Sequence, residues 1–176
     1  MENEFTNQIA PKRPKGMTFF LILSLINACS KIISSLVSFF AIPTAAKMME
    51  SGQLQESYEP IFAMMKWGED EIDTFLATIQ SALSINPNYH LITGLLFIGS
   101  LIGVIMMFKL NKNGLHVYAI SQICMLINAS VFLYPKQPQS AFIYDLLLTS
   151  AFIFMYYSYF KRIELTNLNQ DSDLQP

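Results

Sequence analysis

The chain has 176 residues, of which 52% are hydrophobic and 14% are charged. Soluble domains carry about 25% charged residues, so this composition argues against an ordinary soluble globule. The formal net charge is −2 and no basic stripe with interleaved aromatic residues occurs, which excludes a typical nucleic-acid-binding surface.

Four apolar segments, residues 17–43, 91–108, 115–134 and 141–160, contain only two charged residues, Lys31 and Asp145. Each segment is close to the roughly 20 residues that a helix needs to cross about 30 Å of hydrocarbon. A soluble bundle would need polar outer faces on these helices, and the second and fourth segments have almost none. We therefore predict an all-α membrane protein whose four transmembrane helices form an antiparallel bundle.

The predicted domain organisation is simple. Residues 17–160 form a single four-helix transmembrane domain with an outer loop at residues 45–90. Residues 1–16 and 161–176 are polar tails. The two tight connections between the later segments, around Gly114 and around Pro135 and Pro138, suit helical hairpins, and Gly114 is expected to allow the turn.

The first segment has an alternative reading as a secretory signal, because Lys12, Arg13 and Lys15 precede it and small residues follow it. Its apolar stretch is much longer than the 7–15 residues or so of a signal core, and Lys31 lies at its centre. We therefore predict an uncleaved helix. Polar residues recur along it at three- and four-residue intervals, which places them on one face: Ser24, Asn27, Lys31, Ser34 or Ser35, and Ser38.

The outer loop at residues 45–90 is acidic, with seven Asp or Glu residues and two lysines. An apolar stripe in helical spacing predicts an amphipathic helix, whose N-terminal end the acidic run 69–71 would stabilise: Ile72, Phe75, Leu76, Ile79 and Leu83. Pro60 is expected to open a second, shorter helix that carries Met64, Met65 and Trp67. The loop either docks a partner protein or packs on its own four helices.

The second segment contains Gly99 and Gly103 in a G-x-x-x-G spacing. Small residues at this spacing let two helices approach closely, so we expect this face to meet a helix of the same bundle or of a second copy.

The junction at residues 112–122, with the sequence KNGLHVYAISQ, has a lysine, a glycine and a tyrosine ahead of an apolar helix. It resembles the junction between the second and third spans of small uncharacterised bacterial four-span membrane proteins. The resemblance covers about a dozen residues. It implies a bacterial inner membrane location and transfers no function or functional residue.

Charges near the helix ends predict the orientation. Seven lysines and arginines stand before the first segment, between the second and third, and after the fourth: Lys12, Arg13, Lys15, Lys109, Lys112, Lys161 and Arg162. Lys47, Lys66 and Lys136 lie on the other side. The positive-inside rule therefore places both termini in the cytoplasm.

One polar layer is expected inside the bundle. Counted from the cytoplasmic end of each helix, Lys31, Asp145, Asn128 and Thr93 all lie roughly 21–24 Å deep. A charge at this depth needs a partner, so we predict a Lys31–Asp145 ion pair. The layer is either a proton- or ion-coupled site or a pin that fixes the packing of the helices.

The sequence offers no recognisable catalytic, cofactor or metal site. Cys29 and Cys124 lie within apolar segments, and His90 and His116 are expected at opposite membrane interfaces. We therefore expect no enzyme and no cofactor, and favour an interaction or accessory membrane subunit whose partners are the lipid bilayer and another membrane protein or a second copy. The alternative is a small proton- or ion-coupled transporter or channel subunit that uses Lys31 and Asp145.

Overall fold

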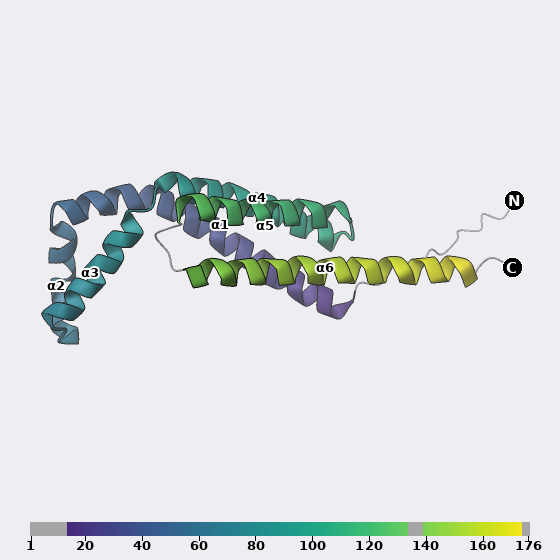
Figure 1. The fold of residues 1–176 in the computed structure, drawn as a ribbon, viewed down its shortest axis with the longest axis horizontal. Coiled ribbons are helices and arrows are strands. Elements are labelled where there is room, and N and C mark those ends of the chain that lie inside the picture. Colours follow the sequence, from purple (N-terminus) through teal and green to yellow (C-terminus); the bar gives the residue numbers. More distant parts are fainter. Residues whose placement is uncertain (1–13, 134–138, 174–176) are drawn as a thin grey trace, which may run out of the picture.

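The computed structural model of the protein describes residues 14–133 and 139–173, and this part of the chain is all helical, without a strand. The helices between residues 53 and 83 are shorter than the others and project from one end of them (Figure 1). The six helices are α1 (Lys15–Glu50), α2 (Gln53–Met65), α3 (Glu69–Leu83), α4 (Pro87–Phe108), α5 (Asn113–Phe132) and α6 (Gln139–Asp173). The predicted all-α class is confirmed.

Four of these helices are long and apolar enough to cross a membrane, which is consistent with a multi-pass membrane protein. They are α1, α4, α5 and the part of α6 from Ser140 to Leu165. Residues 1–13 of the predicted N-terminal tail, and the end of the third predicted segment at residue 134, lie outside the described residues.

Helix α1 is longer than the sequence predicted. It continues past Pro43 to Glu50, so that its 36 residues span about 54 Å against about 30 Å of hydrocarbon. A proline inside a helix removes one backbone donor, yet here it does not end the helix. The end comes at Gly52, whose φ of 76° is a left-handed conformation that glycine adopts without strain.

Helices α2 and α3 form a hairpin that extends across the direction of the long helices (Figure 1). Helix α2 starts directly after Gly52, so Pro60 lies inside it rather than opening it as expected. Helix α3 begins at the predicted acidic run, where the Glu71 carboxylate accepts a hydrogen bond from the Gly68 N–H. Four rings from the two helices and their turn contact one another, some stacked and some edge-on, and form the aromatic core of the hairpin: Tyr58, Phe62, Trp67 and Phe75.

Among the long helices, α4 packs against both α1 and α5, and α6 packs against α5. The buried core lies toward the end opposite the hairpin and includes Met17, Leu21, Val104, Met107, Leu115, Tyr118, Tyr156 and Phe160. The second half of α6 contributes to this core, whereas its first half is largely exposed, with Tyr144 at 71% and Leu147 at 62%. We call the end that carries α2 and α3 the hairpin end.

Glycines bring α4 and α5 into backbone contact. A Cβ added at Gly103 would lie 2.7 Å from the backbone nitrogen of Tyr118, and one added at Gly114 would lie 2.7 Å from the carbonyl oxygen of Gly103. The G-x-x-x-G pair therefore faces a helix of the same chain. Gly114 was expected to serve the turn, but it lies within α5, and the positive φ of the turn belongs to Leu110.

The C-terminal boundary also differs from the prediction. Residues 161–173, expected as a polar tail, continue α6 to Asp173. Lys112 and Glu164 form an ion pair of 2.7 Å between the α4–α5 turn and this extension. Both side chains are exposed, so the pair contributes little, on the order of 1 kcal/mol or less.

Candidate functional site

A cluster of polar side chains joins α4 and α5 near the hairpin end. Asn128 is buried, at 6% exposure, and its Nδ2 donates to the Thr93 hydroxyl at 2.9 Å and to the Tyr89 carbonyl oxygen at 3.3 Å. We call Tyr89, Thr93 and Asn128 the Asn128 cluster. The sequence placed Thr93 and Asn128 at one depth, and the structure brings them into contact.

A second polar contact crosses the same interface closer to its middle. The Gln122 side-chain amide donates to the Ser100 hydroxyl at 3.1 Å, and Ser100 is almost fully buried. Ser121 is also buried, directly against Gly99. Sequence reasoning did not identify Gln122 and Ser121, although Ser121 is a small polar residue of the type that commonly connects helices in lipid.

The Tyr156 hydroxyl connects α6 to α1. It donates to the Phe20 carbonyl oxygen at 2.8 Å and lies 2.8 Å from the Ser24 hydroxyl. Because a phenol has one proton, Ser24 must donate to Tyr156 when Tyr156 donates to Phe20. Tyr156 is completely buried, and its ring meets that of Tyr118 edge-on at 5.4 Å.

The two charges in the candidate membrane spans, Lys31 and Asp145, do not meet. Lys31 and Asp145 are both exposed, and within the described part of the chain they are not within ion-pair distance of each other. The polar stripe of α1 is divided accordingly: Ser24 and Ser35 are buried, whereas Asn27, Lys31 and Ser34 are exposed. Asp145 acts electrostatically on Tyr89, so it lies near the Asn128 cluster, and Lys31 does not join them.

Substitutions in the Asn128 cluster test how much the cluster contributes to the stability of the folded protein. We expect Asn128→Ala to lower the stability of the folded protein by about 1 kcal/mol, because the Thr93 hydroxyl loses its partner in a buried interface. Thr93→Val should cost less than Asn128→Ala, and the double variant should cost less than the sum of both. The midpoint of SDS-induced unfolding measures these effects. Additive losses would show that the two side chains are not coupled.

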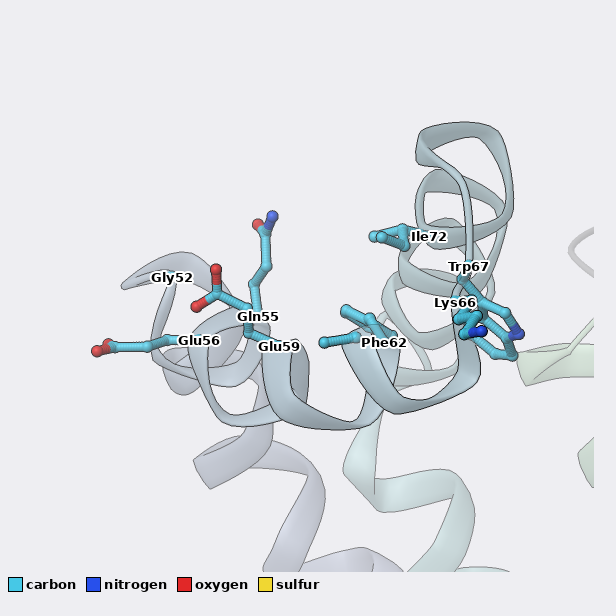
Figure 2. A pocket seen from close by; sticks show the side chains of 9 residues that line it. Gly52, Gln55, Glu56, Glu59, Phe62, Lys66, Trp67 and Ile72 are labelled. Atoms are coloured by element: carbon cyan, nitrogen blue, oxygen red, sulfur yellow. The ribbon is translucent and has the colours of Figure 1, made fainter.

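The hairpin carries a pocket of about 520 Å³ on α2 and the start of α3, with an acidic edge and an aromatic floor. Figure 2 shows Gln55, Glu56 and Glu59 extending from α2, while Ile72 of α3 points to the space above Phe62. Lys66 and Trp67 line the other end of the pocket. The pocket could hold an apolar group beside a cation.

Another face of α2 is apolar and uncovered. Met64 is 77% exposed, Met65 53% and Ile61 42%. These side chains are not part of the stacked aromatic core of the hairpin. Soluble surfaces seldom leave adjacent large apolar side chains in water without a binding role.

The described residues contain no group of three or more His, Cys, Asp and Glu side chains that could hold a metal ion. Cys29 is exposed and Cys124 is half-buried, and they are free thiols on different helices. The Nε2 atom of His90 is buried and has no hydrogen-bond partner in the described part of the chain, and the ring of Tyr89 lies against the His90 ring.

Compared with protein-family models, with curated proteins and with solved structures, the chain gives no match.

Proposed function

We propose that the chain is an integral protein of a bacterial inner membrane, with α1, α4, α5 and α6 crossing the bilayer as an antiparallel bundle. The length and hydropathy of these helices support this proposal. The concentration of lysines and arginines at the end opposite the hairpin supports cytoplasmic termini and an outer position for α2 and α3. The sequence resemblance around residues 112–122 agrees with such a protein.

Within that membrane, the function we infer is a non-enzymatic interaction or accessory subunit, with no nucleic-acid partner and no cofactor, that binds another membrane protein through the α2–α3 hairpin. The observation that carries this inference is the uncovered apolar face of α2, formed by Ile61, Met64 and Met65. The hairpin already has its own aromatic core, so this face is available for a partner. Methionine side chains adapt well to varied surfaces.

The chemistry of the partner follows from the hairpin. Residues 45–90 carry seven acidic side chains against two lysines, and the pocket on α2 combines Glu56 and Glu59 with Phe62 and Trp67. A partner segment with lysine or arginine beside an apolar side chain complements this surface. Such charge complementarity raises the rate and the specificity of association more than the affinity.

Polar substitutions on the apolar face test the proposal. Wild-type protein purified from native membranes in mild detergent should retain a stoichiometric partner. The double variant Ile61→Asn, Met64→Asn should bind this partner at least about tenfold more weakly, because losing an apolar contact of about 1.4 kcal/mol raises the dissociation constant tenfold. Gln80→Asn on the exposed surface of α3 is the matched control and should retain the partner. Equal retention by all three proteins would contradict the proposal.

Insertion of this face into lipid is the competing explanation, and Trp67 reports on it. It is the only tryptophan of the chain and lies in the turn of the hairpin. In vesicles with brominated lipids, a hairpin that binds a protein should keep its tryptophan emission. Strong quenching that the Ile61→Asn, Met64→Asn variant relieves would assign the face to the membrane instead.

The second candidate is a small proton- or ion-coupled transporter or channel subunit that uses Lys31 and Asp145. The specific observation in its favour is the Asn128 cluster, near which Asp145 and the unpartnered Nε2 of His90 also lie. Protein reconstituted in vesicles should then carry protons or ions, and Asp145→Asn should abolish the flux. Absence of flux from wild-type protein removes this candidate.

A further inference from the structure

Among the described residues, two opposite charges in the candidate spans have no ion-pair partner, and both lie on helices that are less covered than α4. Lys31 of α1 and Asp145 of α6 are exposed. In the most apolar 18-residue stretch of α6, only 6% of the residues are buried, against 33% in the corresponding stretch of α4. A charged side chain near the bilayer centre costs roughly 2.5–3.5 kcal/mol on insertion scales, so each of these positions requires a covering polar group.

The two charges lie on faces of α1 and α6 that pack together farther from the hairpin end. Asp145 precedes Phe152 and Tyr156 by seven and eleven residues, two and three helical turns, so it shares their face of α6. Lys31 follows Ser24 by seven residues and shares its side of α1. Ser24 and Tyr156 meet at 2.8 Å. The faces that carry the charges are therefore suited to contact between an α1 and an α6.

Their depths also agree. From the Ser24–Tyr156 contact toward the hairpin end, Lys31 lies about 10 Å along α1 and Asp145 about 16 Å along α6, using a rise of 1.5 Å per residue. The flexible four-carbon stem of a lysine bridges the difference of about 6 Å. An α1 and an α6 that lay side by side along their whole length would bring the two charges together.

Within one chain, the packing keeps these helix halves apart. At the hairpin end α6 is connected to α5 by the few residues between Leu133 and Gln139, and α4 packs between α5 and α1. The first half of α6 is thus separated from its own α1 by the width of a helix, roughly 8–10 Å. A second copy of the chain faces no such obstacle.

We propose that the chain forms a two-fold homodimer in the membrane, in which Lys31 of each copy pairs with Asp145 of the other. A two-fold axis along the membrane normal satisfies both charges of both copies with one contact repeated twice, as isologous interfaces require. The proposal does not depend on a partner for the hairpin.

Cross-linking between differently tagged copies tests this dimer. In a background of Cys29→Ala and Cys124→Ala, one full-length copy carries Lys31→Cys and the other Asp145→Cys. The mixed dimer keeps the reciprocal Asp145–Lys31 pair intact, so the charge that stabilises it is not lost. Treatment of native membranes with a short bismaleimide should yield a product that contains both tags.

Ile33→Cys replaces Lys31→Cys in the matched control. Ile33 is two residues away, about 200° around α1, and is 64% exposed, so at least about fivefold less two-tag product is expected. Two results overturn the proposal. The first is an intramolecular cross-link in a single chain that carries both cysteines, which would mean that α6 closes on its own α1. The second is a yield of two-tag product no higher than that of the control.

Exchange of the charges gives an independent measurement. Energy transfer between labelled copies in lipid nanodiscs should show that Lys31→Asp raises the dissociation constant of the dimer on the order of tenfold, because like charges then face each other. Adding Asp145→Lys to the same chain should restore association. If the exchanged variant dimerises no better than Lys31→Asp alone, the pairing is wrong, even where the single variant is produced poorly.

Discussion

Replacing Gly103 with valine is expected to destabilise the folded protein by more than about 3 kcal/mol, because it forces α4 away from α5. Even the Cβ of Gly103→Ala would lie 2.7–2.9 Å from three backbone atoms of Gly114 and Tyr118, which cannot rotate away as a side chain can. We expect Gly103→Ala to cost about 1–3 kcal/mol. Pulse proteolysis during SDS-induced unfolding measures both losses.

The control for this experiment is Ala151→Val, which adds bulk at an exposed position of α6. It should leave the unfolding midpoint unchanged, since nothing opposes the added methyl groups there. A Gly103→Val variant as stable as Ala151→Val would mean that α4 and α5 do not approach each other at the distance described above.

Removing the side chain of Tyr156 is expected to have the other large effect. Tyr156→Ala should cost about 3–5 kcal/mol, because a fully buried ring leaves a cavity between α6, α1 and α5. Tyr156→Phe keeps the ring and removes the hydroxyl that binds Phe20 and Ser24, so about 1 kcal/mol should be lost. The same unfolding measurement applies, with limited proteolysis to detect the release of α6.

Tyr157→Ala is the matched control, because this neighbouring tyrosine is 54% exposed and makes no ring contact among the described residues. Its effect should be within about 0.5 kcal/mol. If Tyr156→Phe cost as much as Tyr156→Ala, the hydroxyl rather than the ring would hold α6 in place.

Hydropathy predicted the four long helices because a bilayer sets both the length and the composition of whatever crosses it. It could not predict where they end. Helix α1 continues through Pro43 to Glu50 and α6 through the polar residues after Phe160, since a helix stops where its backbone is capped or broken rather than where its side chains become polar.

Counting residues from the end of each helix predicted which polar side chains lie at the same depth along the bundle. Two side chains at the same depth meet only if their helices are neighbours and both side chains face the contact. Asn128 and Thr93 meet because α4 and α5 pack along each other, with close glycine contacts at Gly99, Gly103 and Gly114. Lys31 and Asp145 do not meet within the chain, because the count contains neither the rotation of a helix nor its distance from the others. The burial of Tyr156 could not be predicted, because tyrosine is equally typical of the membrane interface and of a buried hydrogen bond.

The unbroken course of α1 has a mechanical consequence. Lys31 and the end of the helix at Glu50 are 19 residues apart, about 28 Å, and one continuous helix connects them. A tilt imposed on α1 at Lys31 by a bound partner therefore displaces the α2–α3 hairpin through a larger arc than it displaces Lys31. Conversely, a force on the hairpin is transmitted along α1 to Lys31.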